Sequence, residues 1–178
     1  MENAMRPLNH TRAARLLLLC LDQDLTDLAG VDRWAEAALQ HAEAPRWLID
    51  IRHACTKNRR AVQDALQHHA EPVASLETAL AFLALLYTKF KGGAIDIHRC
   101  NAILHSATSR VQIPGEFRYL SGAMSQACRA QQDGFLSEQR AVDLASDLFE
   151  RYSGFSRLIP DFWSECQEAT RAPRTAVA

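Results

Sequence analysis

The chain has 178 residues and a formal net charge of −1 at pH 7, with 48% hydrophobic and 23% charged residues. This composition is typical of a soluble globular protein and excludes a disordered chain, and the length is close to that of one ordinary domain. The charge balance excludes a global positive field of the kind that draws a protein to nucleic acid or to an anionic membrane.

The cysteines and the most apolar segment bear on cellular location. The five cysteines are widely spaced, with no Cys-x-x-Cys pair: Cys20, Cys55, Cys100, Cys128 and Cys166. Their odd number and spacing argue against a disulfide framework and against a zinc ribbon. The apolar run at residues 16–21 is too short for an export signal or a membrane span. We therefore predict a cytoplasmic protein without a membrane anchor.

Apolar residues recur every three or four positions along most of the chain, which is the period of helices with one buried face. A first helix is predicted from a cap near Asn9 to an end by Gly30, with a stripe formed by Leu17, Leu21, Leu25 and Leu28. A second helix carries Trp34 and ends near Pro45, because the residue before a proline disfavours helical geometry. Pro45 then opens a third helix, which carries Trp47.

Five further helices follow the same rules. A short fourth helix covers residues 61–69, and a fifth, at residues 75–92, is apolar on most sides and is therefore predicted to be central. The sixth and seventh are separated by Pro114, and the eighth begins at Ser137 and ends at Gly154. We predict an all-α, single-domain bundle of about eight helices around the helix at 75–92. The domain spans residues 1–170, and residues 171–178 form a frayed tail.

Histidines and carboxylates are the first candidates for a metal site. The sequence has no His-x-x-x-His pair, so the helix-borne zinc pair of metallopeptidases is absent as a local motif. His98 and His105 share a helix face, but a separation of about 10 Å is too far to hold one metal without a third element. Asp64, His68 and Glu71 have closer spacing at a helix end. Surface or capping roles are the simpler interpretation of both groups.

Three other local patterns have structural explanations. Cys100 is two positions from His98, and side chains at that spacing point in different directions on a helix, so we predict an inert core thiol. The glycines that follow Lys89 end a helix and lack the order of a phosphate-binding loop. Basic residues at 57–60 have no aromatic residue among them, which favours a solvated helix junction over a nucleic-acid site. No catalytic residue, metal or cofactor is predicted.

Charge is unevenly distributed along the chain. Residues 22–50 contain seven acidic residues against two arginines, a net charge of −5, and residues 133–168 contain eight against three, again −5. An acidic helical surface can steer a basic partner and set its register. The candidate partner-binding residues are Asp24, Asp27, Asp32, Glu36 and Glu43. The alternative is that these residues only keep the surface soluble.

One stretch within this acidic region has a recognisable pattern. Residues 31–54, VDRWAEAALQHAEAPRWLIDIRHA, place Trp34 on an acidic helix, Glu43 before a turn at Pro45, and Asp50 in the apolar helix that follows. The pattern resembles small all-helical immunity proteins of bacterial toxin loci. The resemblance implies a non-catalytic protein that binds and neutralises a cognate toxin. Its partner would then be a basic toxin domain, with no nucleic acid or membrane involved.

Two other functions stay open. A helical metal- or ligand-dependent enzyme would use Asp96, His98 and His105, with Asp64 or His68 from a separate helix. A regulatory or chaperone-like adaptor would bind an amphipathic helix in a groove beside aromatic residues near the end of the chain, namely Phe155, Phe162 and Trp163. Trp34 and Trp47 are predicted to be core residues under any of these functions, because both lie on apolar stripes.

Overall fold

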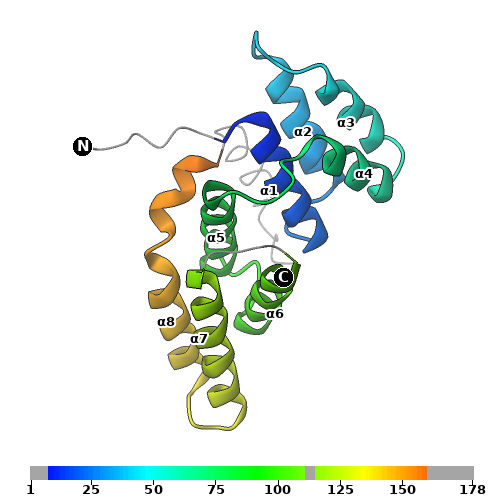
Figure 1. Ribbon diagram of the computed structural model, residues 1–178. Coiled ribbons are helices and arrows are strands. Elements are labelled where there is room, and N and C mark those ends of the chain that lie inside the picture. The colour runs from blue at the N-terminus through cyan, green and yellow to red at the C-terminus, as the bar shows by residue number, and fades with distance from the viewer. Residues whose placement is uncertain (1–7, 111–114, 160–178) are drawn as a thin grey trace, which may run out of the picture. The chain divides into compact units, whose positions relative to one another are not determined.

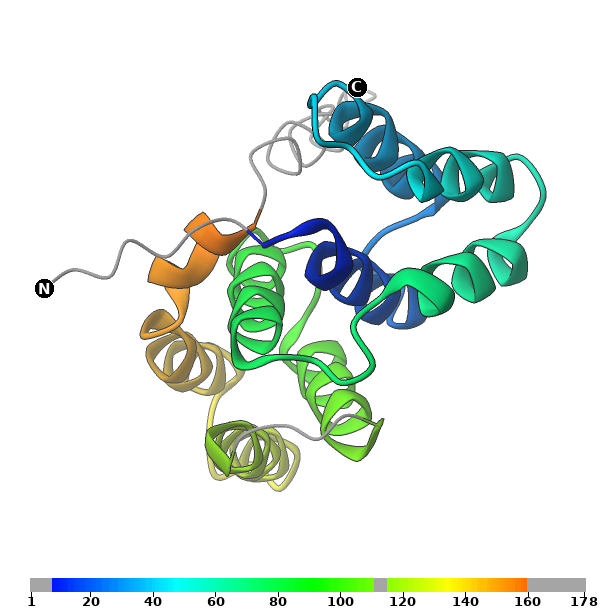
Figure 2. The same ribbon diagram turned by 45° about the horizontal axis from the view of Figure 1, so that its top comes forward.

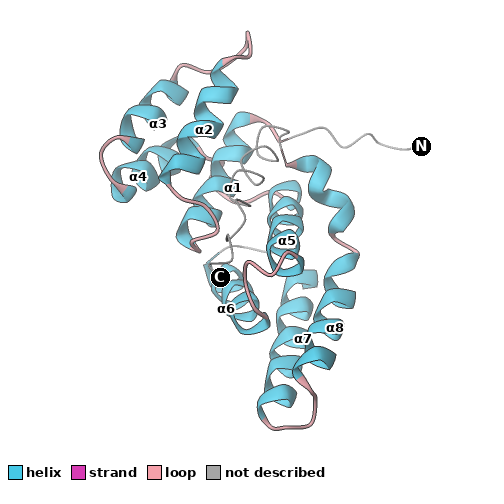
Figure 3. Ribbon diagram, turned by 180° about the vertical axis from the view of Figure 1, so that it is seen from behind, coloured by secondary structure: helices cyan, strands magenta, loops and turns pink. Residues whose placement is uncertain are grey.

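The computed structural model describes residues 8–110 and 115–159, and these are helical almost throughout (Figures 1 and 3). The described residues contain eight α-helices, one 3₁₀ helix and no strand, so the all-α prediction is confirmed. The elements are α1 (His10–Asp22), α2 (Leu28–Leu39), α3 (Trp47–Cys55), α4 (Arg59–His69), α5 (Leu76–Lys91), α6 (Ile97–Arg110), α7 (Gly115–Gln132), α8 (Glu138–Glu150) and the 3₁₀ helix η1 (Ser153–Leu158).

The described residues group into two compact units, the first of which contains α1 to α4. In this unit each helix packs against the next, and α4 packs back against α1, so the four helices form a closed set of neighbours (Figure 2). Its core is formed by fully buried side chains from all four helices: Leu16, Leu17, Leu21, Trp34, Leu48, Ile51 and Leu66. One domain over residues 1–170 stays a prediction, and the predicted tail at 171–178 lies outside the described residues.

The second unit covers residues 71–158 and contains α5 to α8 with η1. Helix α5 begins after the cap Ser75, whose hydroxyl accepts a hydrogen bond from the Thr78 amide, and every residue from 78 to 87 is buried. It packs against α6, α8 and η1, while α7 packs against α6 and α8. The prediction of a central apolar helix at 75–92 is therefore confirmed within this unit.

The first helix ends earlier than the leucine stripe predicts. The predicted end by Gly30 is wrong, because α1 ends at Asp22 and α2 begins at Leu28. Asp24 has a left-handed backbone with a φ of 56°, and the amide of the next residue, Leu25, bonds back into the last turn of α1. This is a helix-ending motif in which the left-handed residue supplies the reversal. The stripe still predicts burial correctly, since Leu25 is buried in the connection.

The new helix start is fixed by a capping carboxylate. Asp27 has an extended backbone, and its Oδ1 accepts a hydrogen bond from the Gly30 amide at 2.7 Å. Such a cap satisfies a helix amide that has no intrahelical acceptor and contributes about 1 kcal/mol. Apolar periodicity alone predicts one helix here, and the capping hydrogen bonds divide it into α1 and α2.

The same connection occurs twice in the second unit. Gly93 and Gly134 are left-handed, with φ values of 71° and 77°, and each stands three residues before a helix cap, Asp96 and Ser137 respectively. After each glycine come two bend residues and the cap, and then the next helix begins. Three of the helix connections in the described chain therefore have the same backbone conformation, with a left-handed residue three positions before the cap of the next helix.

Two other predicted boundaries differ from the structure. Helix α2 ends at Leu39 and α3 begins at Trp47, so Pro45 lies in the connection and does not open α3. Helix α8 ends at Glu150, and Gly154 lies within η1 instead of ending α8. The proline still marks the start of α3 closely, because its carbonyl oxygen accepts a hydrogen bond from the Leu48 amide in the first turn.

Helix α7 and its end offer a matched test of the shared connection. Gly134→Ala should lower the free energy of unfolding by about 1 kcal/mol, because the left-handed region is costly for a residue with a Cβ. Gly122 lies inside α7, and a Cβ there would meet nothing within 4 Å; Gly122→Ala should raise the free energy of unfolding by up to about 1 kcal/mol. Urea unfolding measures both. Shifts of the same sign would contradict the assigned backbone.

Candidate functional site

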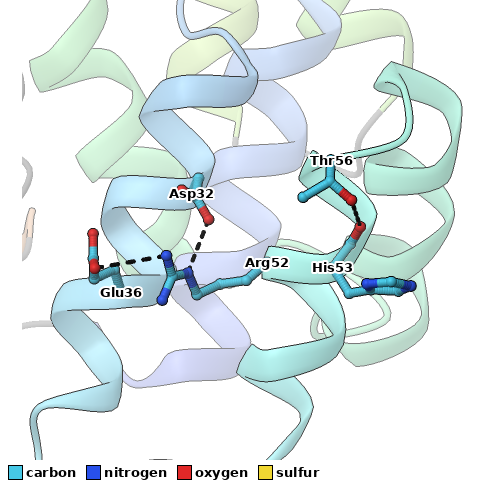
Figure 4. A network of polar contacts seen from close by, with 5 residues as sticks. All are labelled: Asp32, Glu36, Arg52, His53 and Thr56. Atoms are coloured by element: carbon cyan, nitrogen blue, oxygen red, sulfur yellow. Dashed lines mark hydrogen bonds and ion pairs between the residues drawn. The ribbon is translucent and has the colours of Figure 1, made fainter.

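Arg52 joins α3 to the acidic face of α2 (Figure 4). Its Nε lies 2.9 Å from Oδ1 of Asp32, and its Nη2 lies 3.6 Å from Oε1 of Glu36. Asp32 and Glu36 are one turn apart on α2, so a single planar guanidinium reaches both. The hydrogen bond to Asp32 and the charge of this carboxylate raise the pKa of Arg52.

Arg59 joins the start of α4 to the end of α1. Its Nη1 lies 2.6 Å from Oδ1 of Asp24, and its Nη2 donates to the carbonyl oxygen of Leu21. One turn along α4, Nε2 of Gln63 donates to Oδ1 of Asp22 at 2.7 Å. The last carbonyl oxygens of a helix lack intrahelical donors and carry partial negative charge. Arg59 therefore binds both the helix terminus and the acid that follows it.

The Arg59 contacts lie where α1 ends and α4 begins, whereas Arg52 of α3 contacts Asp32 near the middle of α2 and Glu36 one turn before the end of α2. We call the two sets of contacts together the arginine end and define it by Asp24, Asp32, Glu36, Arg52 and Arg59. The carboxylates remain accessible, since the side chains of Asp24, Asp32 and Glu36 are 63%, 37% and 56% exposed.

The five predicted partner-binding acids therefore separate into two groups. Asp24, Asp32 and Glu36 belong to the arginine end, and Asp27, the cap of α2, starts the same helix. Glu43 lies exposed in the connection after α2 and makes no hydrogen bond or ion pair with the part of the chain that is described. The structure thus pairs three of the five with arginines, uses Asp27 as a helix cap, and places Glu43 beyond the end of α2, at the end of the unit opposite the Arg59 contacts.

That opposite end carries aromatic and histidine side chains. Trp47, at the start of α3, stacks on His69, at the end of α4, with ring centroids 4.8 Å apart and planes 8° apart. His68 meets His69 edge-on, with centroids 4.7 Å apart. His10 begins α1 and His41 follows α2. We call this region the histidine end and define it by His10, His41, His68, His69 and Trp47.

The two tryptophans of residues 31–54 lie close together. Trp34 is fully buried, as predicted, whereas Trp47 is only half-buried, and their ring centroids are 6.2 Å apart. The indole Nε1 of Trp34 is buried without a hydrogen-bond partner in the described residues. Trp34 is thus a core residue, and Trp47 bridges this core to the histidine end.

The candidate metal residues make other contacts. Nε2 of His98 lies 3.0 Å from Oε1 of Gln131, across the α6–α7 pair. Asp64 pairs with Arg60 on the surface of α4. Oε1 of Glu71 accepts hydrogen bonds from Ser75 and Thr78 at the start of α5. Over residues 8–110 and 115–159, no three His, Cys, Asp or Glu side chains are placed to hold a metal ion.

The thiols of Cys100 and Cys128, the cysteines of the second unit, are poor nucleophiles. Cys100 is fully buried; burial, together with Cys128 and Asp96, raises the pKa of its thiol to about 12. Burial also raises the pKa of Cys128, whose Sγ lies 3.7 Å from the Ile97 carbonyl oxygen. A thiol reacts as the thiolate, so the predicted inert character of Cys100 agrees with its surroundings.

Sequence reasoning does not single out Arg52 or Gln63, and it interprets Arg59 as part of a solvated junction. A partial signal exists, because Arg59 and Gln63, like Asp32 and Glu36, are four residues apart and so share a helix face. To pair these faces one must know that α4 packs on α1 and that α3 packs on α2. The spacing of residues within one helix does not show which helices pack together.

Comparison with known protein families, with curated proteins and with solved structures gives no match to this chain. Among the described helices, none combines the length and apolar character needed to cross a membrane. Function is therefore inferred from the contacts described above.

The Arg52 contact can be tested against a second arginine of the same unit. Arg52→Gln should lower the melting temperature, and by less at high salt, because a partly exposed pair is screened. Arg60→Gln is the control, since its pair with Asp64 is more exposed, with side chains 82% and 63% exposed, and should change little. Thermal unfolding at 50 mM and 1 M NaCl measures both. Equal losses would contradict a structural role specific to Arg52.

Thiol labelling tests the burial of Cys100. In the native protein at pH 8, a charged aromatic disulfide reagent should modify Cys100 only at the rate of unfolding, because the thiol is both buried and protonated. Labelling in urea should be complete within minutes. Peptide mapping identifies the labelled residue, and rapid native modification of Cys100 would contradict the packing of α6.

Proposed function

We propose that the protein is a non-catalytic protein-binding module of the immunity type, and that the arginine end docks on a basic surface of a cognate toxin domain. One observation carries this proposal: Asp24, Asp32 and Glu36 are positioned by arginines yet keep much of their side chains exposed. Carboxylates held in place lose little conformational freedom when a partner binds. They are therefore suited to receive lysine or arginine side chains.

The exposure of the carboxylates favours a basic partner. Asp22 and Asp27 lie near Asp24 in the sequence, while Arg33, Lys57 and Arg60 are on the same segments, so the support comes from accessible carboxylates and not from an excess of negative charge. Exposed ion pairs are worth only about 0.2–1 kcal/mol, so a partner cation can join or replace an internal one at small cost. Accessible carboxylates on this surface would also guide the approach of a positive surface.

Two further observations support a binding role. The pattern at residues 31–54, which suggested an immunity protein, contains Asp32, Glu36 and Arg52. The side chains considered for catalysis have structural contacts: Asp96 caps α6, His98 bonds Gln131, and Cys100 is buried. Of the aromatic residues considered for an adaptor, Phe162 and Trp163 lie outside the described residues.

Binding kinetics test the proposal with the toxin-like product of the adjacent upstream gene as the probe. Association should slow at least about tenfold between 50 mM and 500 mM NaCl, as expected for electrostatic steering. Asp24→Asn with Glu36→Gln should slow association several-fold at 50 mM NaCl.

The control is Asp147→Asn with Glu150→Gln, which makes the same change in net charge on exposed positions of α8. If steering comes from the arginine end, this control should leave association nearly unchanged. Absence of any complex with that probe, or equal slowing by both double variants, would contradict the proposal.

A further inference from the structure

The histidine end is a second feature of the α1–α4 unit, and the proposed docking surface does not use it. Its central contact is the near-parallel stack of His69 on Trp47, which joins α4 to α3. The His68 ring lies edge-on to the His69 ring, so the imidazole of His69 contacts both the indole of Trp47 and a second imidazole. Such a contact depends on the protonation of rings that titrate between pH 5 and 8.

The charged groups that act on His69 come from two helices. His68 is on α4 itself, and Asp50 is on α3, one turn beyond Trp47. From α1, Nη1 of Arg15 donates to Oε1 of Gln67, next to His68 on α4. A proton on His69 would therefore be repelled by His68, with Asp50 as the opposing charge.

A second histidine pair belongs to the same end. Burial lowers the pKa of His10, and His41 lowers it further, so the first residue of α1 and the connection after α2 are electrostatically coupled. Burial likewise lowers the pKa of His69, with a further lowering by His68 and a partial opposition by Asp50. In both pairs the folded protein favours the neutral ring.

Attraction between a protonated His69 and the face of Trp47 would instead raise the pKa of His69 and stabilise the protonated stack. Cation–π contacts at exposed sites contribute about 0.5–1 kcal/mol, and His68 and burial oppose this term. Burial and His68 both lower the pKa of His69 against a single opposing charge, Asp50, and these two effects favour the neutral stack. For a group whose pKa is lower in the folded state, the stabilisation is complete above the unfolded value and is lost as pH falls through the folded value.

We infer that the histidine end is an acid-sensitive contact. Protonation of His69 beside His68 releases Trp47 from its stack and loosens the end of α4 against the start of α3. The ion pairs of the arginine end join arginines to carboxylates and are separate from this contact. Acid would therefore act on one end of the unit, with the opening beginning below about pH 6.5.

Nuclear magnetic resonance of the full chain tests this inference directly. The His69 and His10 rings should titrate below 6.5, the ordinary histidine value. His68→Gln should move the His69 midpoint upward, and His41→Gln should do the same for His10, because each removes a repelling neighbour. The Trp47 indole signal should shift with the His69 titration. A His69 midpoint at or above 6.5 would overturn the inference, since the protonated stack would then be the stable one.

Unfolding measurements give a second, independent readout. The urea midpoint of the natural protein should fall between pH 7.5 and pH 5.0, and His69→Gln should remove a measurable part of that fall even if it lowers stability at both pH values. His105→Gln is the control, because His105 is an exposed histidine of α6. The same pH dependence in the natural protein and in His69→Gln would overturn the inference.

Discussion

Burial of apolar side chains contributed by all four helices is the interaction on which the α1–α4 unit depends. Burial is not directional, and the arginines add directional contacts to it. The guanidinium of Arg59 on α4 donates to the Leu21 carbonyl oxygen, 38 residues earlier, and pairs with Asp24. Arg52 joins α3 to α2 in the same way. Because these contacts are partly exposed, each contributes little to stability, but together they hold the acidic side chains in place on the surface.

Much of the fold could be predicted because its helices follow apolar periodicity. The stripes over α4, α5 and α7 match buried side chains, including Leu66, Phe82 and Met124. The predictions failed where backbone conformation decides the outcome, as at Asp24, whose positive φ has no glycine to signal it. The later corners at Gly93 and Gly134 were easier, since glycine marks the left-handed position. Asp24 shows that the same geometry can form without that marker.

The candidate site was only partly predictable, for a different reason. Charge counting over residues 22–50 selected the acids of the arginine end, but it could not show that Arg52 and Arg59 hold them. Arg52 stands in a helix with little net charge, and Arg59 belongs to the basic group at 57–60, which the sequence alone does not connect to the acids. A linear charge count treats each acid as available to a partner, whereas packing divides them between caps, internal pairs and open positions such as Glu43. Which carboxylates can serve a partner is thus a tertiary property.

The two ends of the α1–α4 unit differ in the chemistry that holds them. At one end arginines bind carboxylates and a helix terminus, and at the other an imidazole stacks on an indole. Because α1 to α4 all pass between the two ends, a partner that docks at the arginine end would restrain helices whose other ends carry the histidines. Binding there would oppose the opening of the Trp47–His69 stack, since separating helix ends costs more when the remaining contacts are reinforced. By linkage, opening the stack with acid would then weaken binding by the same factor.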